Sequence, residues 1–167
     1  DKLSQFASVQ NMEDRSLTMA LRLQPGPPLH EAPERFIAAM AGAATQVSVV
    51  TTDGPAGRFG VTVSAFSSVS AEPPLVLVCL ANSSSNYAAF ESAKGFAINV
   101  LSEAQKDVSN TFARPVEDRF SAVNWQAGPH GSPVLEGVSA WFDCSMFKTV
   151  EAGDHLIMIG QVEAFEV

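Results

Sequence analysis

The sequence predicts a mainly β protein in which six or seven strands form a closed or split antiparallel barrel with two or three short flanking helices. Apolar segments of strand length recur along the chain, and turn signals rich in glycine and proline separate them. Only a few stretches show the spacing of an amphipathic helix. No GxGxxG motif follows a predicted strand and no GxxxxGK[ST] motif occurs, which argues against a Rossmann domain and a P-loop NTPase.

The first 30 residues differ from the rest of the chain. Apolar side chains in the segment 17–23 alternate with Thr, Ala and Arg, which predicts a half-buried strand: Leu17, Met19, Leu21 and Leu23. We expect residues 1–30 to form an added arm that packs on the barrel or on a second subunit, with a mobile tail as the alternative. Residues 31–167 are then the barrel domain, a length that suits one domain.

The next elements are a helix and a strand. Pro33 suits the first turn of a helix, and apolar residues then recur at helical spacing over about a dozen positions: Phe36, Ile37, Met40 and Ala44. The segment VSVVTT, residues 47–52, reads as a strand, and the sequence DGPAG at 53–57 predicts a turn.

The stretch from Phe59 to Asn82 is the centre of the predicted fold. It reads as two strands, the second being the apolar run LVLVCL at 75–80. Pro73 and Pro74 cannot donate to a strand ladder, so we expect both to lie between the strands. Small hydroxylated residues crowd the first strand: Thr62, Ser64, Ser67, Ser68 and Ser70. Such residues let a flat ligand approach the backbone, although an ordinary edge strand explains them equally well.

The rest of the chain continues the pattern. A short helix is predicted for 83–94, closed by Gly95, and a second helix for 102–113, opened by a capping box at Ser102–Gln105. Residues 114–137 read as irregular. Strands are predicted at 96–101, 138–150 and 155–165, the last two flanking a turn at 151–154.

Charge and composition exclude several classes of function. A net charge of −8 and an isoelectric point near 4.7 argue against nucleic acid or an anionic membrane surface as partner. No apolar run approaches the roughly 18 residues of a membrane span, and the first residues lack the features of a secretory signal. Two free thiols in a cytoplasmic protein are favoured over a disulfide. The three histidines and two cysteines show no metal-ligand spacing, so no metal site is expected.

The segment TVSAFSSVSAEPPLVLVCLANSSS, residues 62–85, closely resembles the flavin-binding core of the short-chain flavin reductase family. The resemblance runs from about Phe36 to Val162. It implies a split β-barrel of the Greek-key, FMN-binding type and a homodimer with two flavin sites near the interface. It also implies an NAD(P)H-dependent reductase that reduces FAD or FMN and supplies the reduced flavin to a separate flavin-dependent monooxygenase.

The resemblance also implies the site residues. The flavin ring would contact Thr62, Val63, Ser64 and Ala65 on one side, and Ser68, Cys79, Leu80, Ala81 and Asn82 on the other. Ser84 and Ser85 would bind the phosphate from the start of the predicted helix, where free N–H groups favour an anion, although serines there are also ordinary caps. Further residues would lie near the flavin or the nicotinamide: Phe112, Ala113, Gly153, Asp154 and His155. Arg119 is a further candidate for the phosphate.

No catalytic acid, base or nucleophile is expected of such an enzyme. Hydride passes between two stacked cofactor rings, and the protein supplies binding and orientation. NADH is favoured over NADPH because no evident arginine cluster awaits a 2′-phosphate. Two alternatives stay open: a flavin- or haem-binding barrel without turnover, for which His155 would have no use, and an enzyme that keeps its flavin and reduces an organic substrate.

Overall fold

A computed structural model describes residue 28 and residues 33–115 and 118–167. The chain divides into two compact units, one ending at Ala44 and the other beginning at Thr45. The first unit contains helix α2, Pro33–Ala41, which begins at the predicted proline and is shorter than the predicted dozen residues. None of its residues is buried. The strand predicted for 17–23 lies outside the described residues.

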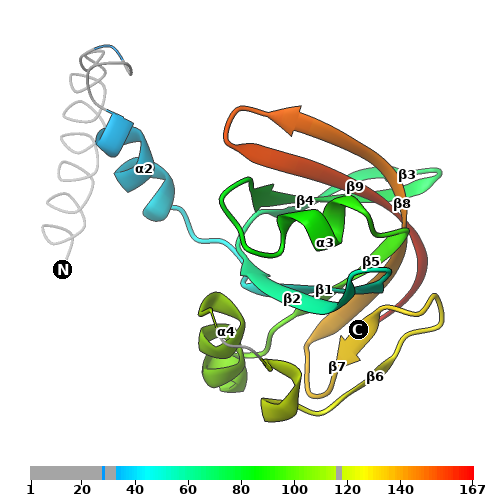
Figure 1. The fold of residues 1–167 in the computed structure, drawn as a ribbon. Helices are drawn as coiled ribbons and strands as arrows, with labels where there is room; N and C mark the ends of the chain where they lie inside the picture. Colours follow the sequence, from blue (N-terminus) through cyan, green and yellow to red (C-terminus); the bar gives the residue numbers. More distant parts are fainter. Residues whose placement is uncertain (1–27, 29–32, 116–117) are drawn as a thin grey trace, which may run out of the picture. The chain divides into compact units, whose positions relative to one another are not determined.

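The second unit contains a seven-stranded antiparallel sheet and a two-stranded one (Figure 1). The strands of the large sheet are β1 Ser48–Gly54, β2 Gly57–Val63, β3 Phe66–Ala71, β4 Pro74–Ala81, β5 Gly95–Val100, β8 Ala140–Ala152 and β9 His155–Glu166. The small sheet pairs β6 Trp125–Ala127 with β7 Pro133–Leu135. The helices are α3 Tyr87–Glu91 and α4 Lys106–Ala113, with 3₁₀ turns at Glu103–Gln105 and Phe120–Ala122.

The connection between β2 and β3 makes the large sheet a barrel. The strand order is β2-β1-β5-β8-β9-β4-β3, so β2 and β3 lie at opposite edges, yet only Ser64 and Ala65 separate them in the chain. The sheet must therefore curve until its two edges meet, as Figure 1 shows. At that seam the N–H of Cys79 donates to the carbonyl of Ala65 at 3.2 Å, and no strand ladder joins β2 to β4 in the part described. The predicted split β-barrel is confirmed.

The β8–β9 hairpin forms the middle of this sheet although it ends the chain. β8 pairs with β5, and β9 pairs with β4. Ala152 and His155 close the hairpin, and Gly153 has a φ of 64°. A two-residue loop with glycine in this conformation at its first position suits a type II′ turn. The hairpin therefore brings His155 opposite Ala81, at the end of β4.

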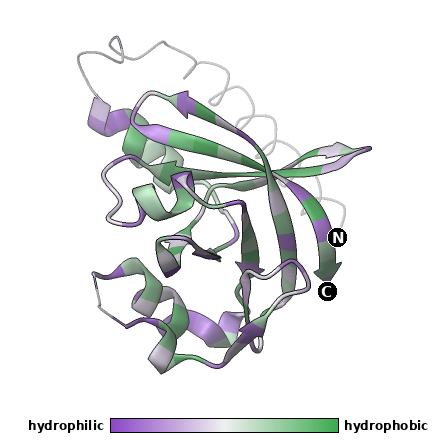
Figure 2. Cartoon of the chain, turned by 45° about the vertical axis from the view of Figure 1, so that its right-hand side comes forward, coloured by the Kyte–Doolittle hydropathy of each residue, from purple (hydrophilic) through white to green (hydrophobic). Residues whose placement is uncertain are grey.

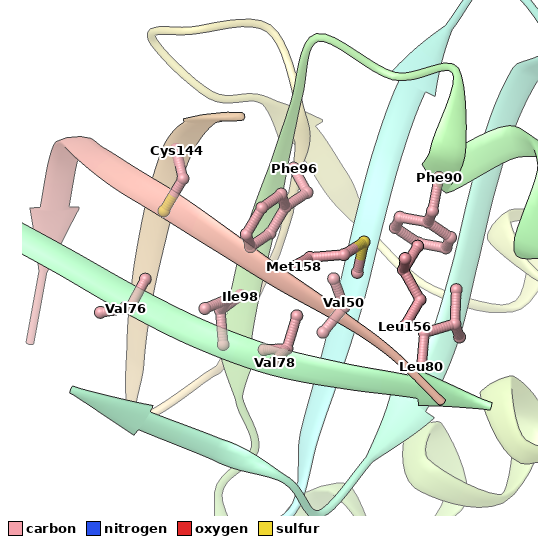
Figure 3. Packing of buried hydrophobic residues seen from close by; sticks show 10 residues of the cluster. All are labelled: Val50, Val76, Val78, Leu80, Phe90, Phe96, Ile98, Cys144, Leu156 and Met158. Carbon is pink, nitrogen blue, oxygen red and sulfur yellow. The ribbon is translucent and has the colours of Figure 1, made fainter. Parts of the chain in front are cut away.

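The barrel is filled by side chains that alternate along the strands. The long strands in Figure 2 are banded with hydrophobic and hydrophilic residues. The buried cluster in Figure 3 contains Val50, Val76, Val78, Leu80, Phe90, Phe96, Ile98, Cys144, Leu156 and Met158. A second cluster contains Val49, Phe112 and Leu135. Since β4 points Val78 and Leu80 inward, Cys79 and Ala81 lie on its outer face.

Two predictions about the central stretch are wrong. The first predicted strand is two strands, because the chain leaves β2 after Val63 and enters β3 at Phe66. Pro74 is not between strands but is the first residue of β4, paired with Ala71. A first strand position tolerates proline because its missing N–H costs no ladder bond there.

The predicted helix at 83–94 is wrong in its extent. Only the five residues of α3 are helical, and the serines before it form turns. The hydroxyl of Ser84 accepts a hydrogen bond from the N–H of Asn86 at 3.3 Å. Serine side chains compete for backbone groups in this way, which favours turns over a helix.

The helix predicted at 102–113 is confirmed, whereas the segment predicted as irregular contains strands. The capping box at Ser102 and Gln105 is present, and the predicted helix forms as a 3₁₀ turn followed by α4. The segment 114–137, predicted as irregular, contains the β6–β7 hairpin. The buried Asn99 binds this hairpin to the barrel, because its amide oxygen accepts the N–H of Leu135 at 2.8 Å.

Candidate functional site

Nine of the sixteen predicted site residues line one cavity of about 200 Å³, which we name the ring pocket. They come from the end of β2, the linker to β3, the end of β4, the turn that follows β4 and the start of β9. The lining residues are Val61, Thr62, Val63, Ser64, Ala65, Cys79, Leu80, Ala81, Ser84 and His155. Val61 is the one member that the sequence did not single out.

The ring pocket lies at the seam of the barrel, where backbone groups leave the strand ladders. Ser64 and Ala65 fall between the last pair of the β1–β2 ladder and the first pair of the β3–β4 ladder. Both residues are exposed. Their N–H groups are thus outside the ladders, at the wall of a cavity that a flat ring can enter. Thr62 is fixed beside them, because its hydroxyl donates to the carbonyl of Ser109 at 2.7 Å.

His155 forms the rim of the ring pocket and is held by its neighbour. Its Nδ1 lies 2.7 Å from Oδ1 of Asp154. The hydrogen bond from His155 lowers the pKa of the Asp154 carboxyl from its ordinary value. This contact fixes the imidazole through one nitrogen and leaves Nε2 available to a ligand.

The turn that carries His155 is tied to the end of β4. The N–H of Asn82 donates to the carbonyl of Asp154 at 2.9 Å, and its side-chain amide donates to the carbonyl of Gly153 at 3.4 Å. Asn82, Gly153 and Asp154 do not line the ring pocket, but they hold its rim in place.

A second cavity, of about 420 Å³, adjoins the ring pocket, and we name it the arginine cavity. Gly60 and Ser85 line this cavity, and their neighbours in the chain, Val61 and Ser84, line the ring pocket. The two cavities therefore lie next to each other along β2 and along the turn before α3, although no residue lines both. The arginine cavity is lined by Arg58, Phe59, Gly60, Ser85, Asn86, Pro115, Asp118, Arg119 and Phe120.

Arg119 donates three hydrogen bonds from its guanidinium group to two backbone carbonyls. Its NH1 donates to the carbonyl of Gly60 at 2.6 Å, while Nε and NH2 donate to the carbonyl of Arg114 at 3.0 and 2.6 Å. Burial lowers the pKa of this guanidinium from its ordinary value. Arg119 brings a positive charge into the cavity, and no carboxylate of residues 33–115 or 118–167 pairs with it.

Arg58 enters the cavity from β2 and is fixed by aromatic rings. Its guanidinium carbon lies 3.8 Å from the centroid of Trp125 and 5.8 Å from that of Phe120. Its NH2 also forms an ion pair with Asp53 at 2.8 Å. Such stacking suits the planar guanidinium group.

Gly60 sits at the junction of the two cavities and has no room for a side chain. A Cβ atom there would lie 2.5 Å from Cε1 of Phe112. Behind the junction, Asn86 is buried, and its side-chain amide donates to the carbonyl of Gly60 at 3.1 Å. The floor of the junction is therefore fixed by close packing and a hydrogen bond.

Six predicted residues line neither cavity: Asn82, Gly153 and Asp154, which hold the rim of the ring pocket, and Ser68, Phe112 and Ala113. Phe112 is fully buried in the second core cluster, where it supports β2. Ala113 ends α4, and Ser68 lies on the exposed side of β3. Arg58 and Asn86 line the arginine cavity but were not predicted from the sequence. No sequence pattern distinguishes Arg58, which follows a common turn signal. Asn86 directly follows the serine run, and this position could have identified it as a candidate site residue.

The ring pocket and the arginine cavity together suit a flavin nucleotide. Pockets for drug-sized ligands measure roughly 300–1,000 Å³, so the 200 Å³ of the ring pocket suits one ring system and not a whole nucleotide.

The described residues contain no group of three or more His, Cys, Asp or Glu side chains that could hold a metal ion. None of the helices described is long and apolar enough to cross a membrane.

Comparisons with known proteins agree with this geometry. The family model for the flavin reductase like domain matches residues 40–167. A "probable flavin reductase" of Rhizobium meliloti is 62% identical over 124 residues, which cover 74% of this chain and 40% of that protein. The stachydrine N-demethylase reductase subunit of the same organism is 54% identical over 123 residues, which cover 73% of this chain and 54% of that subunit.

Among solved structures, the Streptomyces globisporus NADH:FAD oxidoreductase, in complex with NAD and FAD fragments, superposes with a TM-score of 0.79. It is 29% identical, and the match covers 86% of each chain. This chain spans about half or less of the length of the two Rhizobium relatives. The family match covers most of the chain, and the barrel agrees with it in fold. The chain belongs to the flavin reductase like domain family.

Proposed function

We propose that the protein is an NADH-dependent flavin reductase that reduces FAD or FMN and releases the reduced flavin to a separate monooxygenase. The observation that carries the proposal is the convergence of backbone groups at Ser64 and Ala65 with His155 on one ring-sized pocket. The Streptomyces relative is an NADH:FAD oxidoreductase, which supports NADH as the hydride donor.

In this proposal the protein binds and orients two cofactors. When bound, the nicotinamide and the flavin supply the hydride chemistry themselves. The free N–H groups of the β2–β3 linker bind the edge of the flavin ring, and Ser84 and Ser85 lie where its phosphate leaves the ring pocket. His155 holds the nicotinamide through Nε2, since Asp154 occupies Nδ1.

The partner and the oligomeric state are further parts of the proposal. A relative that is the reductase subunit of a demethylase supports a separate monooxygenase partner. We propose a homodimer, because large apolar side chains are exposed on the barrel: Val69 at 47%, Phe147 at 53% and Phe165 at 64%. Light scattering should then give twice the chain mass of 17.7 kDa.

We also propose that residues 1–30 are an arm attached to a flavin-binding domain that spans residues 31–167, and that the protein is cytoplasmic. The family match begins at residue 40, which supports an arm outside the shared domain. Both thiols are free, which suits a reducing compartment. Deleting residues 1–30 tests the arm: we expect weaker dimerisation or weaker flavin retention, and unchanged values would refute it.

The experiment that tests the function is NADH oxidation at 340 nm with purified protein and free FAD or FMN in excess. We expect turnover that scales with added flavin, and reduced flavin in solution under anaerobic conditions. NADPH, supplied at the same concentration, should be used more slowly. If the protein binds flavin but oxidises neither nucleotide, it is a flavin carrier and the reductase proposal fails.

A further inference from the structure

The contact between Asp154 and His155 lies on a turn whose backbone is held from both sides. The pair Ala152–His155 closes the β8–β9 hairpin, and His155 is also paired with Ala81 at the end of β4. The N–H of Asn82 donates to the carbonyl of Asp154 at 2.9 Å. The Asp154 side chain therefore starts from a fixed backbone position, one residue before the histidine that lines the ring pocket.

The partner of Nδ1 determines which nitrogen of the His155 imidazole carries the hydrogen. Nδ1 lies 2.7 Å from Oδ1 of Asp154. The hydrogen bond from His155 lowers the pKa of the Asp154 carboxyl, so this group is ionised at neutral pH. Because an ionised carboxylate can only accept hydrogen bonds, the hydrogen between the two atoms belongs to Nδ1. In the neutral imidazole, Nε2 is then an acceptor.

Nε2 is open to a ligand. No hydrogen bond from residues 33–115 or 118–167 reaches it, and the His155 side chain is 45% exposed. The other polar side chains of the ring pocket carry a hydrogen on oxygen or sulfur: Thr62, Ser64, Cys79 and Ser84. Among the described side chains that line this pocket, Nε2 is thus the atom that can accept a hydrogen bond but cannot donate one.

Such an acceptor distinguishes between groups on a pyridine ring. The carboxamide of nicotinamide has an N–H2 donor and a carbonyl acceptor, like the side-chain amide of asparagine. Nε2 would select the N–H2 group and so also determine which way the carboxamide points. A carboxylate or a methyl ketone in the same ring position has no N–H and would lose this hydrogen bond.

We propose that Asp154 is a positioning residue that keeps the hydrogen of the His155 imidazole on Nδ1, so that Nε2 recognises the carboxamide N–H2 of the nicotinamide. The proposal rests on the proposed function, in which His155 holds the nicotinamide. It makes the protein selective for pyridine dinucleotides that carry a carboxamide. Because both side chains are exposed, the selectivity is that of one hydrogen bond and not the far larger one of a fully buried polar site.

The first test measures the hydrogen positions directly and needs no turnover. Two-bond proton–nitrogen NMR spectra of the purified protein, without added flavin, distinguish a protonated from an unprotonated imidazole nitrogen. At about pH 8.5, where neutral imidazole prevails, we expect His155 to have a protonated Nδ1 and an unprotonated Nε2. In Asp154→Ala both nitrogens should be partly protonated, because the imidazole exchanges between its two tautomers.

The spectrum of His155→Ala identifies the signals, since the chain has three histidines. A protonated Nε2 in the original protein would overturn the proposal, and so would identical His155 signals in Asp154→Ala.

The second test compares NADH with the reduced acetylpyridine analogue of NAD, in which a methyl ketone replaces the carboxamide. The analogue transfers hydride at a rate of its own, so the quantity to measure is the quotient of the two kcat/KM values. This quotient, NADH over analogue, should be roughly threefold to tenfold higher in the original protein than in Asp154→Ala, the effect of one hydrogen bond. Equal quotients would mean that Asp154 only makes a local turn contact.

Glu151→Ala is the matched control, because Glu151 is an exposed carboxylate on the same hairpin and lines neither cavity. It should leave both the His155 signals and the quotient unchanged. If it lowers the quotient as much as Asp154→Ala does, the selectivity comes from negative charge near the rim and the assignment to Asp154 is wrong.

These outcomes stay separate from the test of the reductase activity. NADH oxidation with equal quotients would refute the role of Asp154 and leave the reductase intact. Absence of NADH oxidation would refute the reductase and with it the recognition of the carboxamide. The NMR spectrum would still decide whether Asp154 holds the hydrogen on Nδ1.

Discussion

At the scale of single residues, His155 is the side chain on which the proposed NADH-dependent reductase activity depends. Of the residues that line the ring pocket, only His155 has an imidazole side chain. His155→Ala should raise the KM for NADH roughly twofold to tenfold, the effect of one hydrogen bond of about 0.5–1.5 kcal/mol. The Kd for flavin should stay within twofold of the original. Steady-state kinetics and calorimetry measure the two quantities.

His130→Ala is the matched control, because His130 is an exposed residue in the β6–β7 loop and lines neither cavity. It should change neither constant. If His155→Ala weakens flavin and NADH binding equally, the histidine supports the pocket wall and does not hold the nicotinamide.

Cys79 reports on occupancy of the ring pocket. Burial raises the pKa of its thiol, and burial together with Asp143 and Glu163 raises the pKa of Cys144 to about 12. Because only the thiolate is a good nucleophile, iodoacetamide should modify Cys79 slowly at pH 7. The rate should rise as the pH increases towards the raised pKa. The fully buried Cys144 should react only after unfolding.

Saturating flavin should protect Cys79, because the ring would cover the outer face of β4. Mass spectrometry of the alkylated protein measures this protection. Cys144 in the same sample, after unfolding, gives the full labelling level. Equal labelling of Cys79 with and without flavin would place the flavin ring elsewhere.

At the scale of the elements, the position of β2 depends on the absence of a side chain at Gly60. Gly60→Ala would place a Cβ 2.5 Å from the ring of Phe112, and overpacking of this kind costs about 1–3 kcal/mol. We expect a lower free energy of unfolding in urea and weaker flavin binding, since β2 forms a wall of both cavities.

Gly54→Ala on β1 provides the control. A Cβ at Gly54 meets the Cα of Ala93 at 3.6 Å, which is an ordinary contact, so this variant should unfold like the original protein. If both variants unfold alike, the ring of Phe112 moves aside freely and the junction is less rigid than its packing indicates.

The same elements show what the sequence could and could not predict. The apolar run of β4 and the capping box before α4 gave strong local signals, and both elements formed where expected. The three-residue strands β6 and β7 carry no periodic signal, because they are too short to repeat a pattern. The break after Val63 was also missed, since it results from closure of the whole sheet and not from a local breaker residue.

The two cavities of the candidate site also differ in whether the sequence predicts them. The ring pocket could be predicted because all of its residues except Val61 lie in segments that resemble family motifs, at 62–65, 79–84 and 155. The arginine cavity could not be, because Arg58 and Arg119 are brought together only when the β6–β7 region packs over β2. Phe112 was predicted from the resemblance to lie near the flavin. It is a buried core residue instead, and it supports the site by packing behind β2.

At the scale of the whole molecule, the barrel closes at the ring pocket. The two edge strands of the large sheet meet through the Ser64–Ala65 linker, and the hydrogen bond from Cys79 to Ala65 only extends the β3–β4 pairing, so no ladder in the described residues crosses the seam between β2 and β4. A seam with so few hydrogen bonds opens more easily than a strand ladder. A flavin ring in the pocket would contact both sides of the seam and so hold it closed.

Flavin should therefore slow amide hydrogen exchange on both sides of the seam at once, in peptides that span 61–66 and 79–84. A ligand that binds only the folded state at 100 times its Kd stabilises that state by about 2.7 kcal/mol. Local protection at the seam can exceed this general effect, whereas the β6–β7 hairpin at 125–135 should show only the general effect. If exchange slows equally in all three segments, flavin binding stabilises the fold without closing the seam. Protection of one side alone would mean that the ring lies on β2 or on β4 and does not bridge them.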